Sequence, residues 1–373
     1  MRIGIDARFY SQSGIGRYLR NLISNLQVLD KENEYLVFLL KEDFDNFKET
    51  KNFKKVLANI SWYGFSEQLK FPKLLREYKL DLVHFPHFNV PIFYRGKYIV
   101  TIHDLIHQKY TMTATTRSSF FYSLKHLAYS FAFSKAIKNS QKIITVSEHV
   151  KKDLLKTYNI SKDKVIVTYE GIEKQLVETA KKLTAKKTDE VLKKFNIIPP
   201  FIFYIGSAHP HKNVAGLVEA FQLLRKNYQY LTLVLAGKED YFWRRILKQI
   251  ENDNVRDVIY TNTITEEELA ALYMRTGCYI QPSFEEGFGL PVLEAMSLGC
   301  PVASSNTASL PEVGGDAALY FEPSNIYEIS EKIKEVLNNG KLRKELKEKG
   351  LKRAKEFDFE KMTKQTLSVY NSV

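Results

Sequence analysis

The stretch QPSFEEGFGLPVLEAMSLG, residues 281–299, decides how the fold of this chain is interpreted. Glu286 precedes a turn with two glycines, and Glu294 follows eight residues later. Pro291 suits the first turn of a helix, where its missing N–H costs nothing, and Gly299 is typical of a helix end. The turn therefore leads into a helix N-terminus, whose free N–H groups and positive dipole predict an anion site.

The two carboxylates lie on either side of this predicted anion site. A carboxylate only accepts hydrogen bonds, so neither Glu286 nor Glu294 can bind a phosphate itself. Each carboxylate can accept hydrogen bonds from hydroxyl groups that flank a bound phosphate. A diphosphate flanked by sugar hydroxyls is the outline of a nucleotide-sugar, and the stretch predicts that class of ligand.

Around this stretch, short β-rich runs alternate with amphipathic helical patterns along most of the chain. Strands are expected at residues 2–7, 34–40, 81–85, 97–104, 142–147 and 165–171, and at 201–206, 231–237, 258–263, 278–283, 301–306 and 317–323. Continuous apolar strands separated by helices indicate parallel sheets covered on both faces. The chain is therefore predicted to be α/β, with two doubly wound domains that bind ligands at the carboxyl ends of their strands.

The predicted domains are separated by a segment without strands. Residues 1–175 form the first domain and residues 199–356 the second. Residues 176–198, rich in Lys, Thr and Ala, contain one helix-like piece and are interpreted as the linker.

Lys212 belongs to the second candidate site. The strand at 201–206 ends at Gly206, and Lys212 in GSAHPHKN lies just before the next helix. The helix that begins near Pro291 follows another strand of the same sheet, so both point to one edge. A lysine there donates to a diphosphate and offsets the charge that develops as a nucleotide leaves.

Two further candidates lie in the first half. His103, in the polar pair His103–Asp104, follows an apolar strand. Gly14 and Gly16 form a tight turn between the first strand and its helix, where N–H groups can approach an anion. This turn lacks the third glycine of the dinucleotide fingerprint.

The amino-acid composition limits the classes of partner that the protein is expected to bind. The 373 residues carry a formal net charge of +12, which suits nucleic acid, an anionic membrane surface or a solvated helical face. The lysines spread over helical sequence such as residues 341–357, which favours the solvated face, and no nucleic acid is expected. No apolar run approaches the roughly 18 residues of a membrane helix. The N-terminus lacks a signal peptide's apolar region, so a cytoplasmic protein is expected.

Three other patterns receive ordinary interpretations. Cys278 and Cys300 lie in strand sequence and are expected to be buried thiols. Asp43 and Asp45 form a D-x-D in a charged loop, and no metal site is expected there. The aromatic and basic helix around residues 120–133 is interpreted as core, with a membrane-surface contact as the alternative, which leaves peripheral membrane association open.

Taken together, these segments resemble the retaining glycosyltransferases of family 4, which have the GT-B architecture. The segment 285–302 resembles that family's E-x7-E region, and TIHD, TVSEHVKKDL, VTYEGIE, GSAHPHKN and SGIGRY resemble its shorter motifs. The resemblance covers essentially the whole chain. It implies two Rossmann-like domains facing across a cleft, with the donor on the second, the acceptor on the first, and a terminal helix at 357–373 packing back on the first.

The resemblance also implies residue roles. Glu286 corresponds to the carboxylate that contacts the donor hexose, and Glu294 to the one that holds the ribose. Phe288, Gly289 and Leu290 would supply backbone N–H groups. Lys212 would bind the diphosphate, His103 would lie beside the donor sugar, and Gly14 near the donor phosphate; Gly206 and Ser207 complete the donor set, and acceptor residues stay unknown.

One position departs from the family. Many members have an arginine directly after the strand-end glycine, where this chain has Ser207. His209, His211 or Arg17 are candidate replacements. A charged hydrogen bond contributes roughly 1.5–3 kcal/mol, so an uncompensated loss would weaken donor binding.

The favoured hypothesis is a retaining, metal-independent transferase that moves a hexose, mannose or glucose, from a GDP- or UDP-linked donor to a hydroxyl of a glycan or lipid-linked acceptor. Mannose is slightly favoured, by resemblance alone. No cofactor or metal is expected. The alternatives are a nucleotide-sugar epimerase or phosphorylase on the same scaffold, a non-catalytic nucleotide-sugar-binding protein, and a nucleic-acid binder.

Overall fold

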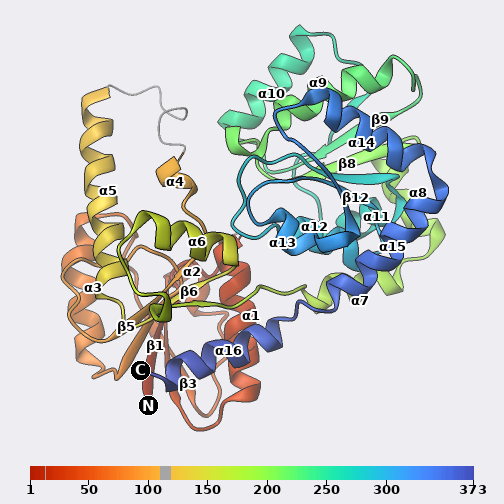
Figure 1. Cartoon of the computed structure of the whole chain (residues 1–373). Helices are drawn as coiled ribbons and strands as arrows, with labels where there is room; N and C mark the ends of the chain where they lie inside the picture. Colours follow the sequence, from red (N-terminus) through yellow and green to blue (C-terminus); the bar gives the residue numbers. More distant parts are fainter. Residues whose placement is uncertain (13, 110–118) are drawn as a thin grey trace. The chain divides into compact units, whose positions relative to one another are not determined.

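The computed structural model describes residues 1–12, 14–109 and 119–373, and their side chains except those of residues 107, 109 and 119–128. The chain divides into two compact units (Figure 1). Unit 1 consists of Met1–Gly171 together with Asp358–Val373, and unit 2 consists of Ile172–Phe357.

In the described residues, unit 1 is built on a seven-stranded sheet with the order β3-β2-β1-β4-β5-β6-β7. Its strands are β1 (Arg2–Asp6), β2 (Glu34–Leu39), β3 (Phe53–Leu57), β4 (Leu82–Phe85), β5 (Tyr98–Ile102), β6 (Ile143–Thr145) and β7 (Val165–Val167), paired in parallel. Its helices are α1 (Gly14–Leu29), α2 (Lys41–Phe44), α3 (Phe65–Glu77), α4 (Ile106–Lys109), α5 (Ser119–Asn139), α6 (Glu148–Thr157), the 3-10 turn η1 (Lys162–Lys164) and α16 (Phe359–Asn371). Every residue of β4, β5 and β6 is buried, as in a parallel sheet covered on both faces.

The last helix, α16, belongs to unit 1. Figure 1 shows α16, in blue, beside α1, in red, and the two helices are in contact. Met362 and Tyr370 of α16 are fully buried in the same apolar cluster as Leu19 and Leu22 of α1. The Tyr370 hydroxyl lies 2.7 Å from Nδ1 of His84 on β4, which ties the C-terminus to the middle of the sheet.

Strand β3 is absent from the sequence prediction. Its residues FKKVL include two lysines, and only Phe53 and Val56 are buried. Their spacing of three breaks the alternation expected of a strand. The strand forms because it lies at the sheet edge, where Phe53 stacks on Tyr35 with ring centroids 4.2 Å apart.

In unit 2 a six-stranded parallel sheet has the order β10-β9-β8-β11-β12-β13. Its strands are β8 (Phe201–Ile205), β9 (Thr232–Ala236), β10 (Val258–Tyr260), β11 (Cys278–Gln281), β12 (Val302–Ser305) and β13 (Ala318–Phe321). Its helices are α7 (Lys174–Lys182), α8 (Ala185–Lys194), α9 (Val214–Arg225), α10 (Tyr241–Asn252), α11 (Glu266–Arg275), α12 (Leu290–Ser297), α13 (Leu310–Gly314), α14 (Ile326–Asn338) and α15 (Gly340–Ala354), with 3-10 turns η2 (Pro210–Lys212) and η3 (Gly315–Ala317). The predicted α/β class and the two doubly wound sheets are confirmed.

The segment 176–198 differs from its interpretation as a linker. It contains most of α7 and all of α8, and both helices pack against α11 within unit 2. Leu176 and Ala180 are buried against Ala270, and Arg275 donates to Thr188 at 2.8 Å. The Lys-rich composition describes the solvated faces of these helices and hides the few apolar residues that dock them.

Each sheet has one place where the strand order reverses. In unit 1 the chain runs outward from β1 through β2 to β3 and then returns to β4 on the other side of β1. In unit 2 the equivalent pair is β8 and β11. Ligands of open α/β sheets bind outside the carboxyl ends of strands at such a switch point, so these two places are where sites are expected.

The other sequence patterns are partly resolved. Cys278 and Cys300 are buried free thiols, as predicted, and burial raises the pKa of Cys278 to about 12. Of the aromatic helix, Phe133 is buried and Phe131 is exposed, whereas residues 120–128 lie outside the side chains described. Among the residues described, no helix is long and apolar enough to cross a membrane.

Candidate active site

Two loops meet at the switch point of unit 2, one after β8 and one after β11. The backbone N–H of Phe284 donates to the carbonyl of His211 at 2.8 Å. The side-chain amide of Asn213 donates to the carbonyls of Pro282 (3.1 Å) and Pro323 (2.7 Å). Because Asn213 is buried and makes both bonds, it ties the loop after β8 to the loops after β11 and β13.

Lys212 and Glu286 form an ion pair across these loops. Nζ of Lys212 lies 2.7 Å from both carboxylate oxygens of Glu286. The Lys212 side chain is 20% exposed and that of Glu286 is 9% exposed, so the pair borders solvent. The structure thus brings together the two residues that the sequence placed on separate motifs.

The carboxylate of Glu286 has two further partners. The side-chain amide of Gln281 and the hydroxyl of Ser283 each donate to its Oε1 at 2.8 Å. Burying a carboxylate requires such donors, since an unpaired buried charge is strongly destabilising. Burial, together with the Glu286 charge, also raises the pKa of the Tyr204 phenol.

The turn before α12 has the geometry that an anion site needs. Gly289 has φ 104°, a left-handed conformation that favours glycine, and a Cβ there would lie 2.7 Å from Leu310. Gly289 is the N-cap of α12 and offers no side-chain cap, and Leu290 and Pro291 open the helix. The hydroxyl of Ser309 donates to the carbonyls of residues 286 (3.0 Å) and 288 (2.8 Å), which holds the turn in place.

Glu294 lies one turn into α12 and is buried. The Tyr273 hydroxyl donates to it at 3.1 Å. Burial raises the pKa of Tyr273, and the Glu294 charge raises it further, so this phenol stays a donor. The predicted helix end at Gly299 is also confirmed, since Gly299 has φ 70° just past α12.

The loop after β8 contains the departure from the family. Gly206 accepts a hydrogen bond from the indole of Trp243 (3.2 Å), and the Ser207 carbonyl accepts one from Tyr204 (2.7 Å). His209 stacks with His211 at 5.7 Å between ring centroids. The structure therefore places both candidate histidines on the same loop as Lys212.

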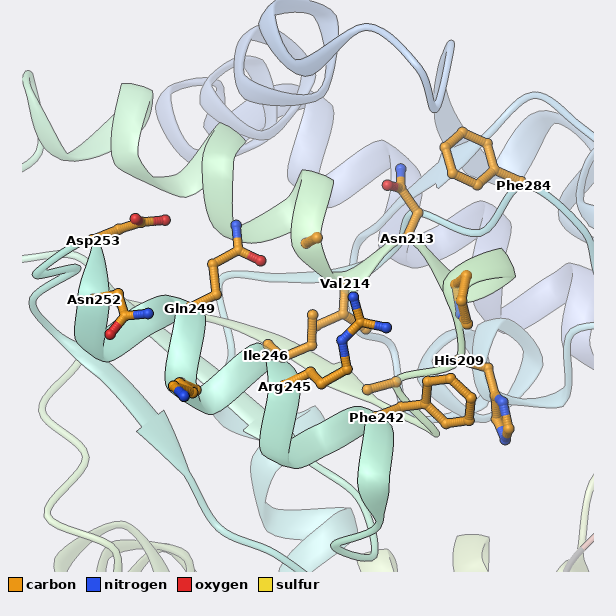
Figure 2. Close-up of a pocket in the computed structure, with 14 residues that line it drawn as sticks. His209, Asn213, Val214, Phe242, Arg245, Ile246, Gln249, Asn252, Asp253 and Phe284 are labelled. Carbon is orange, nitrogen blue, oxygen red and sulfur yellow. The ribbon is translucent and has the colours of Figure 1, made fainter. Parts of the chain in front are cut away.

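A separate hollow of about 580 Å³ opens beside this loop, between α9 and α10 (Figure 2). Figure 2 shows His209 and Phe242 at one end and Asp253 at the other. Of the residues predicted to bind the donor, none is among those described as lining it. The hollow is therefore distinct from the Lys212–Glu286 pair.

His103 and Gly14 lie in unit 1. Nε2 of His103 is 3.0 Å from the carbonyl of Pro86, and Nδ1 is 3.3 Å from the carboxylate of Glu170. Both partners are acceptors, so both contacts are hydrogen bonds only when both ring nitrogens carry protons. The role of this histidine beside a donor sugar stays a prediction.

The glycine turn of unit 1 is tighter at Gly16 than at Gly14. A Cβ on Gly16 would collide with the carbonyl oxygen of Tyr10, whereas one on Gly14 would meet nothing within 4 Å. Gly14 is the first residue of α1. Glycine is therefore required for steric reasons at Gly16. A phosphate-binding role for Gly14 stays a prediction.

Several residues of the site were missed from the sequence. Gln281 and Ser283 lie in the opening stretch itself, as polar residues at the end of an apolar strand, and that position was the available signal. Glu170 lies in the quoted segment VTYEGIE, again just after a strand. Tyr273 carries no local signal, because it reaches Glu294 from the last turn of a separate helix, α11.

Comparison with known proteins agrees with this geometry. The sequence profile "Glycosyl transferases group 1" matches residues 164–353, and "Glycosyltransferase Family 4" matches residues 12–176. The chain is 28% identical to the O-antigen chain mannosyltransferase B of Escherichia coli, over 97% of this chain and 96% of that protein.

Solved structures share the fold. Sucrose-phosphate synthase from Thermosynechococcus elongatus is similar with a TM-score of 0.78 and 17% identity, over 100% of this chain and 98% of that one. Anabaena Alr3699/HepE in complex with UDP-glucose gives a TM-score of 0.76 and 14% identity, over 100% of both chains. The two-domain GT-B architecture is confirmed, and the group 1 profile alone covers more than half of the chain. This protein therefore belongs to the glycosyl transferases group 1 family.

Proposed function

We propose that this glycosyltransferase is a retaining, metal-independent hexosyltransferase that transfers mannose from a GDP- or UDP-linked donor to a hydroxyl of a glycan or lipid-linked acceptor. The observation that carries the proposal is the Lys212–Glu286 pair at the switch point, beside the glycine N-cap of α12. The O-antigen mannosyltransferase, similar along its whole length, supports mannose over glucose.

The proposed donor lies across the N-terminus of α12. Its diphosphate accepts hydrogen bonds from the first N–H groups of the helix and from Lys212, which shares its charge between the phosphate and Glu286. Glu286 accepts hydrogen bonds from the hexose hydroxyls. Glu294, one turn into α12, accepts hydrogen bonds from the ribose diol. Gln281 and Ser283 hold the Glu286 carboxylate, so its orientation is set before the donor binds.

The proposed reaction breaks the bond between the anomeric carbon and the diphosphate oxygen. Lys212 and the α12 dipole stabilise the charge that develops on the leaving diphosphate. The acceptor hydroxyl attacks from the face that the diphosphate leaves, and the departing phosphate takes its proton. The configuration at the anomeric carbon is retained, with no step that requires a metal or a covalent intermediate.

A donor screen tests this proposal. Thermal unfolding is followed with GDP-mannose, UDP-glucose, GDP-glucose and UDP-galactose, and a donor at 100 times its Kd should stabilise by about 2.7 kcal/mol. Transfer to α-linked mannose oligosaccharides is then measured with and without EDTA, and the product linkage is assigned by NMR. Equal rates with EDTA and an α-linked product are expected.

Lys212→Ala and Glu286→Gln should each lower the transfer rate by roughly 100-fold or more, the usual loss for one group that stabilises a developing charge. The matched controls are Lys344→Ala and Glu348→Gln, from an exposed ion pair of unit 2, which should leave the rate unchanged. Full activity of both site variants would refute the proposal, and sugar interconversion without any acceptor would indicate an epimerase.

A further inference from the structure

Aromatic rings gather in unit 1 after the carboxyl ends of β1, β3 and β4. The ring of Phe9 stacks on Trp62 with centroids 4.6 Å apart and lies 5.2 Å from His87. His87 in turn lies 3.9 Å from Phe88 and 6.2 Å from Tyr63. We call Phe9, Trp62, Tyr63, His87 and Phe88 the aromatic platform.

The platform lies at the switch point of unit 1. Phe9 follows β1, and His87 and Phe88 follow β4, the two strands between which the sheet order reverses. Trp62 and Tyr63 come from the loop after β3. This is the position in unit 1 that corresponds to the Lys212–Glu286 pair in unit 2, and it is where an open α/β sheet binds its ligand.

A buried network of charged side chains fixes the loop that carries Trp62 and Tyr63 of the platform. The Arg8 guanidinium donates to Asp6 at 2.7 Å and to Glu67 at 2.6 Å, and all three side chains are almost fully buried. The other oxygen of Glu67 accepts the backbone N–H of Tyr63 at 2.8 Å. These bonds fix the loop after β3 to the end of β1, so the rings above it are held in place.

Tyr63 is held in an unusual conformation. Its φ is 60°, in the left-handed region that bulky residues rarely adopt, and its side chain is 57% exposed. Such strain persists only where the surroundings determine it and is concentrated at functional sites. The hydrogen bond that the Tyr63 amide donates to Glu67 supplies that determination.

Polar groups lie around the rings. Tyr63 Oη and His87 Nδ1 are 3.5 Å apart. The ring of Tyr129 lies edge-on to Phe88 with centroids 4.9 Å apart. Burial raises the pKa of the Tyr129 phenol, and the charge of Asp104 raises it further, so this hydroxyl stays a hydrogen-bond donor beside the platform.

We infer that the aromatic platform is an acceptor subsite that stacks a sugar ring. A pyranose has an apolar C–H face and a rim of hydroxyls, and Tyr, Trp and His present an apolar body with a polar tip. A few polar groups around aromatic walls give such a site its orientation. The inference rests on the proposed function and deepens it, because it selects a glycan as the acceptor class.

The platform differs from a surface for a lipid chain. Its two wholly apolar rings, Phe9 and Phe88, are buried, and the rings that reach the surface each carry a polar atom. Among the side chains that the structure describes, the exposed apolar residues Phe65 and Leu69 lie on α3, outside the platform. A sugar ring needs both an apolar face and polar edges, whereas a lipid chain leaves the polar edges unused.

Intrinsic fluorescence tests the inference without any transfer reaction. The chain has two tryptophans, and Trp243 is fully buried, so a ligand at the platform changes the emission of Trp62. Methyl α-mannoside, methyl α-glucoside and an α-linked mannotriose are titrated into the full chain. A saturable change is expected with at least one of them and should be absent in Trp62→Phe.

Transfer kinetics supply the second measurement. Trp62→Ala and Tyr63→Ala should each raise the acceptor KM by roughly tenfold, equivalent to about 1.4 kcal/mol, with stabilisation by the donor unchanged. Tyr230→Ala, an aromatic side chain 86% exposed on unit 2, is the matched control and should leave the KM unchanged. The two site variants are independent, so a folding defect in one does not remove the test.

The outcomes separate the two proposals. The acceptor subsite alone is overturned by the following result. A donor stabilises the protein and transfer is normal, but no saccharide changes the fluorescence and the acceptor KM is unchanged in both variants. A saccharide response without transfer from any donor overturns the proposed function and leaves a sugar-binding platform. Binding to phosphatidylglycerol vesicles that is lost in Trp62→Ala, with no saccharide response, assigns the platform to a membrane surface and overturns the inference.

Discussion

The two sheets reverse their strand order at equivalent places but surround those places with opposite chemistry. At β8 and β11 of unit 2, a lysine and a glutamate pair at the border of solvent, next to a helix N-terminus with a glycine cap. At β1 and β4 of unit 1, the charges are buried beneath aromatic rings. Topology sets where a ligand binds, and the side chains after each strand decide which ligand it is.

The comparison also shows two ways to use an ion pair. The Asp6–Arg8–Glu67 network is almost fully buried and fully bonded, with Asn89 donating to Glu67 at 2.7 Å, so it supports a loop. The Lys212–Glu286 pair keeps one side open, so its charges stay available to a ligand. The buried charges stabilise the structure, and the charges at the border of solvent are those we propose to bind the donor.

The largest expected effect comes from breaking the buried network. Arg8→Met should lower the free energy of unfolding of unit 1 by about 3–5 kcal/mol, because it leaves Asp6 and Glu67 buried without their cation. Burial already raises the pKa of Glu67 although the Arg8 charge opposes it. Denaturant unfolding followed by hydrogen exchange in each unit measures the loss.

Two controls sharpen this prediction. Lys212→Met should lower stability far less, by about 1 kcal/mol, since Gln281 and Ser283 still donate to Glu286. Arg244→Met, in an exposed pair with Glu239, should change stability by less than about 0.5 kcal/mol. Equal losses in Arg8→Met and Lys212→Met would erase the distinction between the two switch points.

A pH titration examines the interior of unit 1 next to its switch point. His84 is fully buried between Thr101 and Tyr370, and burial, with a smaller contribution from His103, lowers its pKa to about 3. Between pH 3 and the usual histidine pKa near 6.5, the unfolded chain therefore binds a proton that the folded unit does not. This stabilisation is complete above pH 6.5 and is lost as the pH falls.

The expected slope is at most one proton, or about 1.4 kcal/mol per pH unit across that window. Urea unfolding of unit 1 from pH 7 to pH 4 measures it in the unaltered protein and in His84→Asn, which does not titrate. The slope of the variant should be smaller by about one proton. Identical slopes would show that His84 takes up its proton in the folded state.

The smallest expected effect separates the glycine turns of the two units. Gly289→Ala should destabilise unit 2 by about 1–2 kcal/mol, because its φ of 104° and the close Leu310 side chain both oppose a Cβ. Gly14→Ala should leave the stability of unit 1 unchanged, since nothing lies within 4 Å of the added atom. Thermal unfolding gives both values, and a loss in Gly14→Ala as large as in Gly289→Ala would contradict the assignment.

Much of the fold was predictable, because local patterns specify it. All the expected strands are present, and α12 begins and ends where Pro291 and Gly299 predicted. The failures have a common cause. Strand β3 and the helices at 174–194 carry many lysines and few buried apolar residues, so their composition resembles that of a solvated loop or linker.

The candidate site was predicted in its parts and not in its bonds. Glu286 and Lys212 were found because each lies between the end of a strand and the start of a helix, and Glu294 because it lies eight residues after Glu286, within the predicted helix. Their partners Gln281 and Tyr273 were not, and neither was the network of Arg8. A hydrogen bond between side chains on separate elements leaves no local periodicity, so its partners stay hidden until the elements are packed.

The sequence by itself determined the α/β class, the strand ends at which ligands are expected, and the carboxylates before and within α12. It did so because periodicity, capping and turn residues act over a few positions. The tertiary structure alone decided that Lys212 reaches Glu286, 74 residues away, and that Phe9, Trp62 and His87 form one platform. Strand order sets which loops become neighbours, and that order results from packing the whole sheet.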